Sequence, residues 1–416
     1  MRRLLIDLRR RAQTNVLRTA RSSRFFPRTL VDRQGDDVRL AASSLDAAVM
    51  VYFPGALDTL YQITPWLPTF EAVHDAHRAV IVCQDSRVAG HLRRACRVPV
   101  LTVARYGTLD GLLSRSDVGL ALYVSHLPRN FENLRFSSLL HAYIGHGDSD
   151  KGVSASNQLK AYDYFFAPGD AAVERVAARL MRFDAADRGI VVGQPVTLSA
   201  PPSAAPAAEG PSTVLYAPTW EGAQPSVAYS SVLSHGEAMV RELLDDDRYR
   251  VLYRPHPLTG VTSRLYAVAD RAIREAVAAA GPGNEVVDAD AEPVEATMAR
   301  SHLLVADVSA VTTAWLPSLR PLVVTEAGVD AQSADSGLLG SVPRITADRA
   351  GSIGAVLADA AADEAGRDRR RRLVEHYLSP YWPDACERRF VDVVGRVLDE
   401  RARLRADLVT GGATGV

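Results

Sequence analysis

The sequence predicts an α/β fold with two doubly wound, Rossmann-like domains joined by a linker. Short apolar runs alternate with amphipathic stretches from about residue 46 onward, which is typical of parallel strands connected by helices. Residues 198–212 then contain four prolines and no large apolar side chain after Leu198, which is the composition of a linker. Because the same alternation restarts after this segment, we expect two similar halves.

The first half contains apolar runs of strand length, each followed by polar or amphipathic residues. Helical patterns lie between them, for example over Ser86–Cys96 and Asp170–Arg182. The predicted strands cover Ala47–Phe53, Ala79–Cys83, Pro99–Val103, Val118–Val124, Ser138–Ile144, Tyr162–Ala167 and Ile190–Val192.

The second half repeats this organisation and ends in helices. Its predicted strands cover Thr213–Ala217, Arg250–Tyr253, Glu285–Val287, His302–Ala306 and Leu322–Thr325. Its predicted helices cover Ser230–Leu244, Arg264–Ala280, Val294–Ser301 and Asp368–Tyr377, with a final helix from about Asp384 to Arg405. The predicted organisation is a basic arm at 1–45, a first domain at 46–200, a linker at 201–212, a second domain at 213–383, and a C-terminal helix and tail at 384–416.

The composition is ordinary for a soluble globular enzyme, with 47% apolar and 23% charged residues among 416. The formal net charge of -1 argues against a molecule that binds polyanions over its whole surface. Cys83, Cys96 and Cys386 fit neither a metal spacing nor a disulfide framework, so we expect a reducing compartment. No apolar run approaches the roughly 20 residues that span a bilayer, and the N-terminus lacks a secretory signal pattern. We therefore expect a cytoplasmic protein.

An arginine-rich segment opens the chain. Residues 1–30 hold nine arginines against one acid, Asp7, with leucines at near-helical spacing among them and Phe25 and Phe26 near the end. Three explanations remain open: a basic amphipathic element on an anionic membrane surface, an arm that binds nucleic acid, and a helix packed on the body. Nucleic acid is the least favoured partner, because no zinc spacing or aromatic sheet motif accompanies the arm. We expect an anionic membrane surface as the partner and no nucleic acid.

The segment 144–151 concentrates reactive side chains directly after a predicted buried strand. It places His146 between two glycines, which let the backbone turn sharply and let a ligand approach closely. Ligands of open α/β sheets bind at the carboxyl ends of the strands, so His146 is a candidate general base. The plainer alternative is a polar turn in which Asp148 or Ser149 caps the next helix.

Two further segments follow strands of the second half. The segment 254–257 reads Arg-Pro-His-Pro, and its prolines hold His256 out of a regular helix. A rigid histidine beside Arg254 suits a pyrophosphate, while the alternative is a histidine packed at a strand exit. Thr219 and Trp220 follow the first strand and offer a hydroxyl and a ring that would wall a pocket, although such a tryptophan often packs in the core.

The fourth segment, 307–313, marks a strand that gives way to a helix. It carries the hydroxyls of Ser309, Thr312 and Thr313 at the predicted helix N-terminus. Backbone amides and the helix dipole favour phosphate there, and hydroxyls add donors. The alternative is a simple cap with Ser309 at the N-cap position.

Together these segments resemble the CDP-glycerol glycerophosphotransferase family, the teichoic acid primases and polymerases, over about residues 138–326. The most specific match is Leu215–Trp220, which is close to the family's Tyr-Ala-Pro-Thr-Trp motif. The other matches are His146-Gly147 with Lys151, Tyr162-Asp163-Tyr164 with Pro168, Arg254-Pro255-His256-Pro257, and Asp307-Val308-Ser309 with Arg320-Pro321.

The resemblance implies a GT-B fold, in which two Rossmann-like domains face a central cleft. It also implies transfer of an alditol phosphate, glycerol phosphate or ribitol phosphate, from a CDP-alditol to a hydroxyl of a cell-envelope polymer or lipid-linked acceptor, with release of CMP. Under it, His146 is the general base and His256 steadies the pyrophosphate. Ser309, with Thr312 or Thr313, contacts phosphate or ribose, and Thr219 lies near the nucleotide. The remaining substrate contacts are expected from Gly147, Ser149, Lys151, Trp220, Arg254 and Asp307.

The sequence departs from the family pattern at Asp148-Ser149, where Thr-Pro is common, at Glu221, where a basic residue is frequent, and at Ala310 and Ala314. These changes leave the alditol and the nucleotide open. Alternatives on the same fold are a nucleotide-sugar glycosyltransferase and a sugar-nucleotide 2-epimerase. No carboxylate cluster has metal-ligand spacing, so we expect no required cofactor, although Asp307 could recruit a divalent metal. The expected location is the inner face of the cell membrane, as a peripheral enzyme of wall or capsule synthesis.

Overall fold

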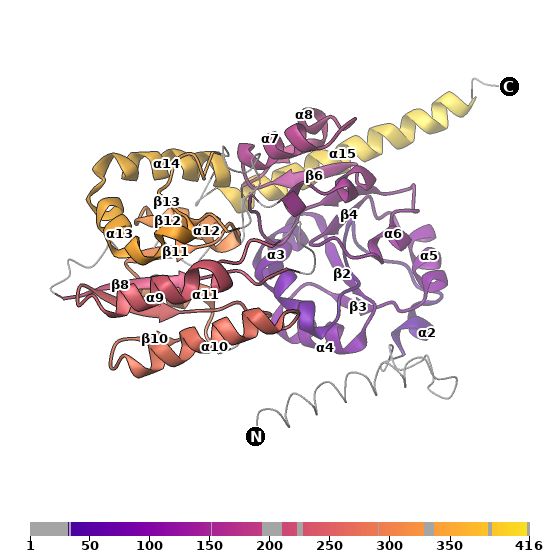
Figure 1. Ribbon diagram of the computed structural model, residues 1–416. Coiled ribbons are helices and arrows are strands. Elements are labelled where there is room, and N and C mark those ends of the chain that lie inside the picture. The colour runs from indigo at the N-terminus through magenta and orange to yellow at the C-terminus, as the bar shows by residue number, and fades with distance from the viewer. Residues whose placement is uncertain are drawn as a thin grey trace. The chain divides into compact units, whose positions relative to one another are not determined.

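The computed structural model describes residues 32, 35–150, 152–193, 210–222, 228–289, 291–327, 337–381 and 385–413 (Figure 1). Contacts divide the chain into unit 1, residues 1–141 with 394–416, and unit 2, residues 142–393. The arginine-rich segment 1–30 and residues 201–209 of the predicted linker lie outside the described residues. The domain boundaries drawn from the sequence remain predictions.

The first sheet has seven strands in the order β3-β2-β1-β4-β5-β6-β7. Every pairing with a defined register in this sheet is parallel, and Val49 of β1, for example, lies opposite Ala79 and Leu120. All residues of β1 and β2 are buried, as expected for strands covered on both faces. The strands are β1 (Val49–Phe53), β2 (Ala79–Cys83), β3 (Val100–Thr102), β4 (Leu120–Tyr123), β5 (Leu140–Tyr143), β6 (Tyr164–Ala167) and β7 (Gly189–Val191).

Helices connect these strands. In α4, buried Val88, Ala89 and Leu92 form the apolar side of an amphipathic helix, and the Asp85 side chain caps it by accepting from the amide of Arg87. The α-helices are α2 (Asp36–Leu40), α3 (Leu67–His77), α4 (Ser86–Ala95), α5 (Tyr106–Ser114), α6 (Asn130–Asn133), α7 (Asp170–Arg179) and α8 (Ala185–Arg188). The 3-10 turns are η2 (Leu57–Gln62), η3 (Thr64–Trp66), η4 (Gly152–Ala155) and η5 (Asn157–Ala161).

The second sheet lies in unit 2 and has six strands in the order β10-β9-β8-β11-β12-β13, again with parallel pairings. Side chains alternate between its faces, so Val214 and Tyr216 of β8 join one core cluster and Leu215 and Ala217 join the other. The strands are β8 (Ser212–Ala217), β9 (Tyr249–Tyr253), β10 (Glu285–Val286), β11 (Leu303–Ala306), β12 (Leu322–Thr325) and β13 (Arg344–Ile345).

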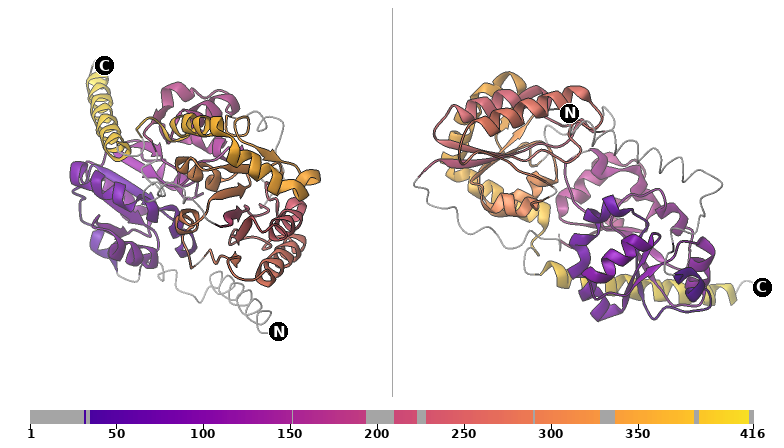
Figure 2. Two further views of the ribbon diagram at one scale, coloured as in Figure 1. Left: turned by 90° about the vertical axis from the view of Figure 1, so that its left-hand side faces the viewer. Right: turned by 90° about the horizontal axis from the view of Figure 1, so that it is seen from below.

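Helices cover both faces of the second sheet (Figure 2). Residues of α9, α10 and α13 pack on one face and residues of α11, α12 and α14 on the other, which makes this sheet doubly wound. The helices are η7 (Val232–Gly236, a π-helix), α9 (Glu237–Leu244), α10 (Arg264–Ala279), α11 (Val294–Ala299), α12 (Ala310–Trp315), η8 (Leu316–Ser318), η9 (Ala347–Ser352), α13 (Ile353–Ala362), α14 (Glu364–Leu378) and α15 (Cys386–Ala413).

The structure confirms the α/β class and every strand predicted from the apolar runs, and corrects some helix bounds. The helix predicted over Asp368–Tyr377 begins earlier, because Asp363 caps α14 by accepting from the amide of Gly366. The final helix does not end near Arg405, since no proline or glycine interrupts the chain there and α15 continues to Ala413. The short strand β13 was not predicted. No helix in the described part of the chain is long and apolar enough to cross a membrane.

Candidate active site

The loop that carries His146 follows β5, and Gly145 lies at its start in a backbone conformation that favours glycine. Gly145 has a φ of 69°, in the left-handed region that side chains disfavour. The next two residues, His146 and Gly147, are exposed. A Cβ on Gly147 would lie 3.6 Å from the Cβ of Ala310, so the loop passes close to the first residue of α12. The geometry thus presents an accessible imidazole beside the segment that carries the predicted hydroxyls.

Two acidic residues of this loop, Asp148 and Asp150, belong to a buried ion cluster. Arg175 of α7 donates through Nη1 to Asp148 Oδ1 at 2.7 Å and through Nη2 to Asp148 Oδ2 at 3.1 Å. The same Nη2 donates to Asp150 Oδ1 at 3.0 Å, and the Tyr377 hydroxyl of α14 donates to Asp150 Oδ2 at 2.7 Å. The carboxylate of Asp148 is thus paired with a cation in a bidentate bond, which favours an anchoring role for this side chain.

The charges in this cluster influence one another. Burial raises the pKa of Asp148, although the guanidinium of Arg175 opposes that rise. Burial alone would lower the pKa of Arg175, but the two carboxylates raise it. Burial, together with the charge of Asp150, raises the pKa of Tyr377. One guanidinium thus binds two buried carboxylates, and loss of that cation would leave them without any compensating charge.

The rest of the loop has a plainer structure. Ser149 is buried and its hydroxyl lies 3.2 Å from the hydroxyl of Ser154 in η4. That contact keeps Ser149 within the loop's own hydrogen bonding. Lys151, the cation predicted to contact substrate, lies outside the described residues.

Asp307, at the end of β11, organises the adjoining loop. Its carboxylate is fully buried and accepts from the amide of Thr219 at 2.7 Å, the amide of Ser231 at 3.2 Å and the hydroxyl of Thr325 at 2.6 Å. Burial raises its pKa despite these hydrogen bonds. Because its oxygens are engaged by three partners, the geometry favours Asp307 as the group that positions Thr219 over direct contact with substrate.

His256 and Trp220 lie against each other. Their ring centroids are 6.3 Å apart and their planes are inclined by 25°, so the indole ring stacks against the imidazole ring. The amide of Leu258 donates to His256 Nδ1 at 3.1 Å, which leaves the proton of a neutral ring on Nε2. Arg254, two residues before His256 in the chain, donates through Nη2 to the carbonyl of Glu292 at 2.8 Å, and burial lowers its pKa. A histidine with a donor at Nε2 suits an anionic oxygen.

Glu221 ties two loops of the site together. Its carboxylate accepts from the amide of Gly260 at 2.9 Å, from the amide of Thr262 at 3.0 Å and from the amide of Ser263 at 3.1 Å. Burial alone would raise the pKa of Glu221, but these hydrogen bonds lower it. The carboxylate therefore fixes the loop between His256 and α10, a role that a basic side chain at this position would not fill.

The three hydroxyls of the fourth segment have different environments. Ser309 is the N-cap residue of α12, and the Thr312 hydroxyl accepts from its amide at 3.2 Å and lies 2.7 Å from its carbonyl oxygen. The Ser309 hydroxyl lies over the amide of Thr312 in a capping-box arrangement, without a hydrogen bond of ordinary geometry. Among the described residues, the buried Thr313 hydroxyl also has no hydrogen-bond partner. Thr312 therefore has a structural role, whereas the hydroxyls of Ser309 and Thr313 are available to bind a ligand.

Contacts within unit 2 bring the four predicted segments together. Gly147 passes α12, the amide of Thr219 binds Asp307, and Trp220 stacks on His256. The sequence did not single out Arg175 or Ser231, and it marked Glu221 only as a departure from the family pattern, because the roles of these residues depend on contacts with distant residues. Within the described ranges, no group of three or more His, Cys, Asp or Glu side chains could hold a metal ion.

Comparison with known proteins identifies a family over part of the chain. Residues 194–340 match the family model described as CDP-Glycerol:Poly(glycerophosphate) glycerophosphotransferase. This match includes the second, third and fourth predicted segments. It confirms the resemblance inferred from the motifs and the prediction of a CDP-glycerol glycerophosphotransferase-like enzyme. No curated protein is significantly similar to the chain in sequence.

Solved structures show the fold. A protein from Listeria monocytogenes described as a UDP-N-acetylglucosamine 2-epimerase has a TM-score of 0.56 at 13% identity, over 85% of this chain and 96% of that one. A glycosyltransferase from Rickettsia africae has a TM-score of 0.55 at 11% identity, over 85% of this chain and 99% of that one. The wall teichoic acid polymerase TagF aligns over 97% of this chain and 99% of its own, with 14% identity and a TM-score of 0.48. The first two similarities confirm the GT-B-like fold.

Proposed function

Because residues 194–340 match the glycerophosphotransferase family, we propose that this enzyme transfers an alditol phosphate from a CDP-alditol to a hydroxyl and releases CMP. The family description supports the coarser statement that the chain is a cell-envelope transferase. The observation that carries the finer proposal is the assembly of the four motif segments within unit 2. In that assembly His146 lies on an exposed loop, and His256 stacks on Trp220, the neighbour of the Thr219 that binds Asp307.

In the proposed reaction, the acceptor hydroxyl oxygen attacks the phosphorus that carries the alditol. His146 accepts the hydroxyl proton, a task suited to an imidazole near neutral pH. The bond from this phosphorus to the bridging oxygen breaks, and CMP leaves with the electron pair. The products are the alditol phosphate joined to the acceptor and a nucleoside monophosphate.

The negative charge that develops on CMP needs donors. His256 can donate through Nε2, because its Nδ1 accepts from the amide of Leu258. The hydroxyls of Ser309 and Thr313 add donors, and Arg254, two residues before His256 in the chain, adds positive charge. Donors held in place before the reaction stabilise such charge without reorganisation. This donor set makes no demand for a metal ion, and activity retained in excess EDTA is the expected result.

Product analysis tests the proposal. The protein is incubated with CDP-glycerol, CDP-ribitol and a UDP-sugar, each with a hydroxyl acceptor, and the released nucleotides are separated by chromatography. Release of CMP from a CDP-alditol is expected, and comparison of the two alditols identifies the donor. Release of UDP from the UDP-sugar, or its epimerisation, with no turnover of either CDP-alditol would support a nucleotide-sugar enzyme instead.

The proposed partners are the CDP-alditol donor and a polymeric or lipid-linked acceptor at the inner face of the membrane. Residues 1–30 hold nine arginines and Asp7, an excess of eight positive charges. Basic residues near an anionic leaflet contribute about 1 kcal/mol each. We propose that this segment attaches the enzyme reversibly to the surface where such an acceptor would be found.

A further inference from the structure

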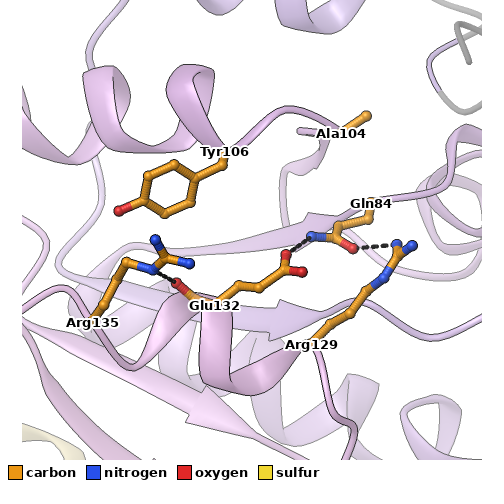
Figure 3. Close-up of a pocket in the computed structure, with 6 residues that line it drawn as sticks. All are labelled: Gln84, Ala104, Tyr106, Arg129, Glu132 and Arg135. Carbon is orange, nitrogen blue, oxygen red and sulfur yellow. Dashed lines mark hydrogen bonds between the residues drawn. The ribbon is translucent and has the colours of Figure 1, made fainter.

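Unit 1 contains a cavity of about 460 Å³ that has no part in the site described above. This volume falls within the usual range for small-molecule sites. Five of the six lining residues have polar or charged side chains, and Figure 3 shows them around one space. The lining residues are Gln84, Ala104, Tyr106, Arg129, Glu132 and Arg135.

The cavity lies at the carboxyl ends of strands of the first sheet, where ligands of such sheets usually bind. Gln84 directly follows β2, Ala104 follows β3, and Arg129 lies between β4 and β5. The strand order β3-β2-β1-β4 places β2 on one side of β1 and β4 on the other, so the direction in which successive strands are added to the sheet reverses at β1. Open α/β sheets bind ligands outside the carboxyl ends of their strands at such a reversal.

Buried Gln84 fixes one side of the cavity. Its Oε1 accepts from Arg129 Nη1 at 2.6 Å, and its Nε2 donates to the Tyr52 hydroxyl of β1 at 2.7 Å. The same Nε2 lies 3.4 Å from Glu132 Oε2, a weak contact. The Gln84 amide thus orients the guanidinium of Arg129, which lines the same cavity (Figure 3).

The other side carries a second cation. The guanidinium of Arg135 lies 4.3 Å from the centre of the Tyr106 ring, and its Nε donates to the carbonyl of Glu132 at 3.1 Å. Tyr106 in turn stacks on Phe136, with ring centroids 5.4 Å apart. Among the ion pairs of the described residues, none joins the Glu132 carboxylate to either arginine of the cavity. Two cations and one carboxylate therefore face a shared space without neutralising each other.

We propose that this cavity binds a phosphorylated polyol, the alditol-phosphate end of the acceptor. Arg129 and Arg135 would hold the phosphate, since guanidinium groups match its oxygens. Glu132 would accept hydrogen bonds from polyol hydroxyls, a role that a simple anion site would not need. The assignment to the acceptor rests on the proposed function, whereas the chemistry of the ligand rests on the cavity.

Direct binding tests the chemistry. Titration calorimetry on the full chain uses sn-glycerol 3-phosphate, inorganic phosphate and glycerol as separate probes. We expect Arg129→Gln and Arg135→Gln each to weaken glycerol phosphate binding about tenfold or more, since a charge-assisted hydrogen bond is lost. Glu132→Gln should weaken glycerol phosphate binding but not phosphate binding. Arg94→Gln, an exposed arginine of α4 outside the cavity, is the control and should bind as wild type.

Kinetics with a short glycerol phosphate oligomer tests the source of the ligand. The arginine variants should raise the acceptor KM and leave the donor KM unchanged, while a change in the donor KM alone would assign the cavity to the donor and overturn the acceptor assignment. If wild type turns over no CDP-alditol, the proposed function fails, but calorimetry still decides the cavity. Glycerol phosphate binding that is equal in wild type and both arginine variants overturns the proposal.

Discussion

The ion cluster behind the His146 loop gives the strongest test of how this site is held. Arg175→Met removes the cation but keeps an unbranched side chain that can occupy part of the same space. Asp148 and Asp150 then share a buried space with no guanidinium, and their side chains are only 11% and 4% exposed. Removing one partner of a buried ion pair costs about 3–5 kcal/mol, because the remaining charge is left uncompensated.

The loss should depend on pH with a defined sign. Burial already raises the pKa of Asp148, and without Arg175 that pKa must rise further. A carboxyl whose pKa is higher in the folded than in the unfolded protein destabilises the fold above its folded pKa, and the penalty shrinks as the pH falls through it. The variant should therefore lose most stability at neutral pH and approach wild type under mildly acidic conditions.

Thermal unfolding of the full chain measures this effect. A loss of this size lowers the melting temperature by roughly 10 °C in a unit of a few hundred residues. Asp148→Asn combined with Arg175→Met should recover part of the loss, because one buried charge is gone. The cluster does not hold the loop as argued if Arg175→Met and wild type have the same melting temperature at neutral pH. The same conclusion follows if the melting temperature of the variant is lowered equally at neutral and at mildly acidic pH.

The remaining predictions address chemistry and location. His146→Ala should lower the transfer rate by about 10²–10⁴-fold with donor binding nearly intact, and wild-type turnover in single-turnover assays would remove it as the base. His256→Ala should raise the KM for the donor more than that for the acceptor, with exposed His91→Ala as control; equal donor kinetics in both variants would contradict the assignment. Deleting residues 1–28 should release the protein from anionic liposomes but spare activity on a soluble acceptor, and undiminished sedimentation with vesicles would favour a helix packed on the body.

Strands were predictable because their signal is local. The run Ala79–Cys83 is apolar throughout and became β2 with the same bounds, and Leu322–Thr325 became β12 in the same way. The missed strand β13 has two residues, Arg344 and Ile345, which is too short for any periodic pattern. Helix ends were harder, since the cap of α14 depends on a single side chain, Asp363.

Candidate site residues could be proposed from the sequence only where neighbouring residues formed a motif. His146 and His256 stand in short patterns with prolines or glycines, and these patterns could be recognised without a structure. Arg175 is one of many arginines on amphipathic helices, and its pairing with Asp148 spans 27 residues. Its importance comes from burial, which the sequence of α7 does not reveal. The cavity of unit 1 was missed for the same reason, because its residues follow three different strands.

The departures from the family pattern have structural roles that explain how the chemistry can persist. Asp148, where the family commonly has threonine, is clamped by Arg175 and so anchors the loop that presents His146. Glu221, where a basic residue is frequent, binds the loop that follows His256 through backbone amides. Ala310, where a serine is usual, lies close to Gly147 and presents only a methyl group to the passing loop. Each change alters what supports a reactive group and leaves the group itself in place. Under the proposed function, we therefore expect these changes to alter the preference among alditols or acceptors and to leave the attack of a hydroxyl on a phosphoanhydride unchanged.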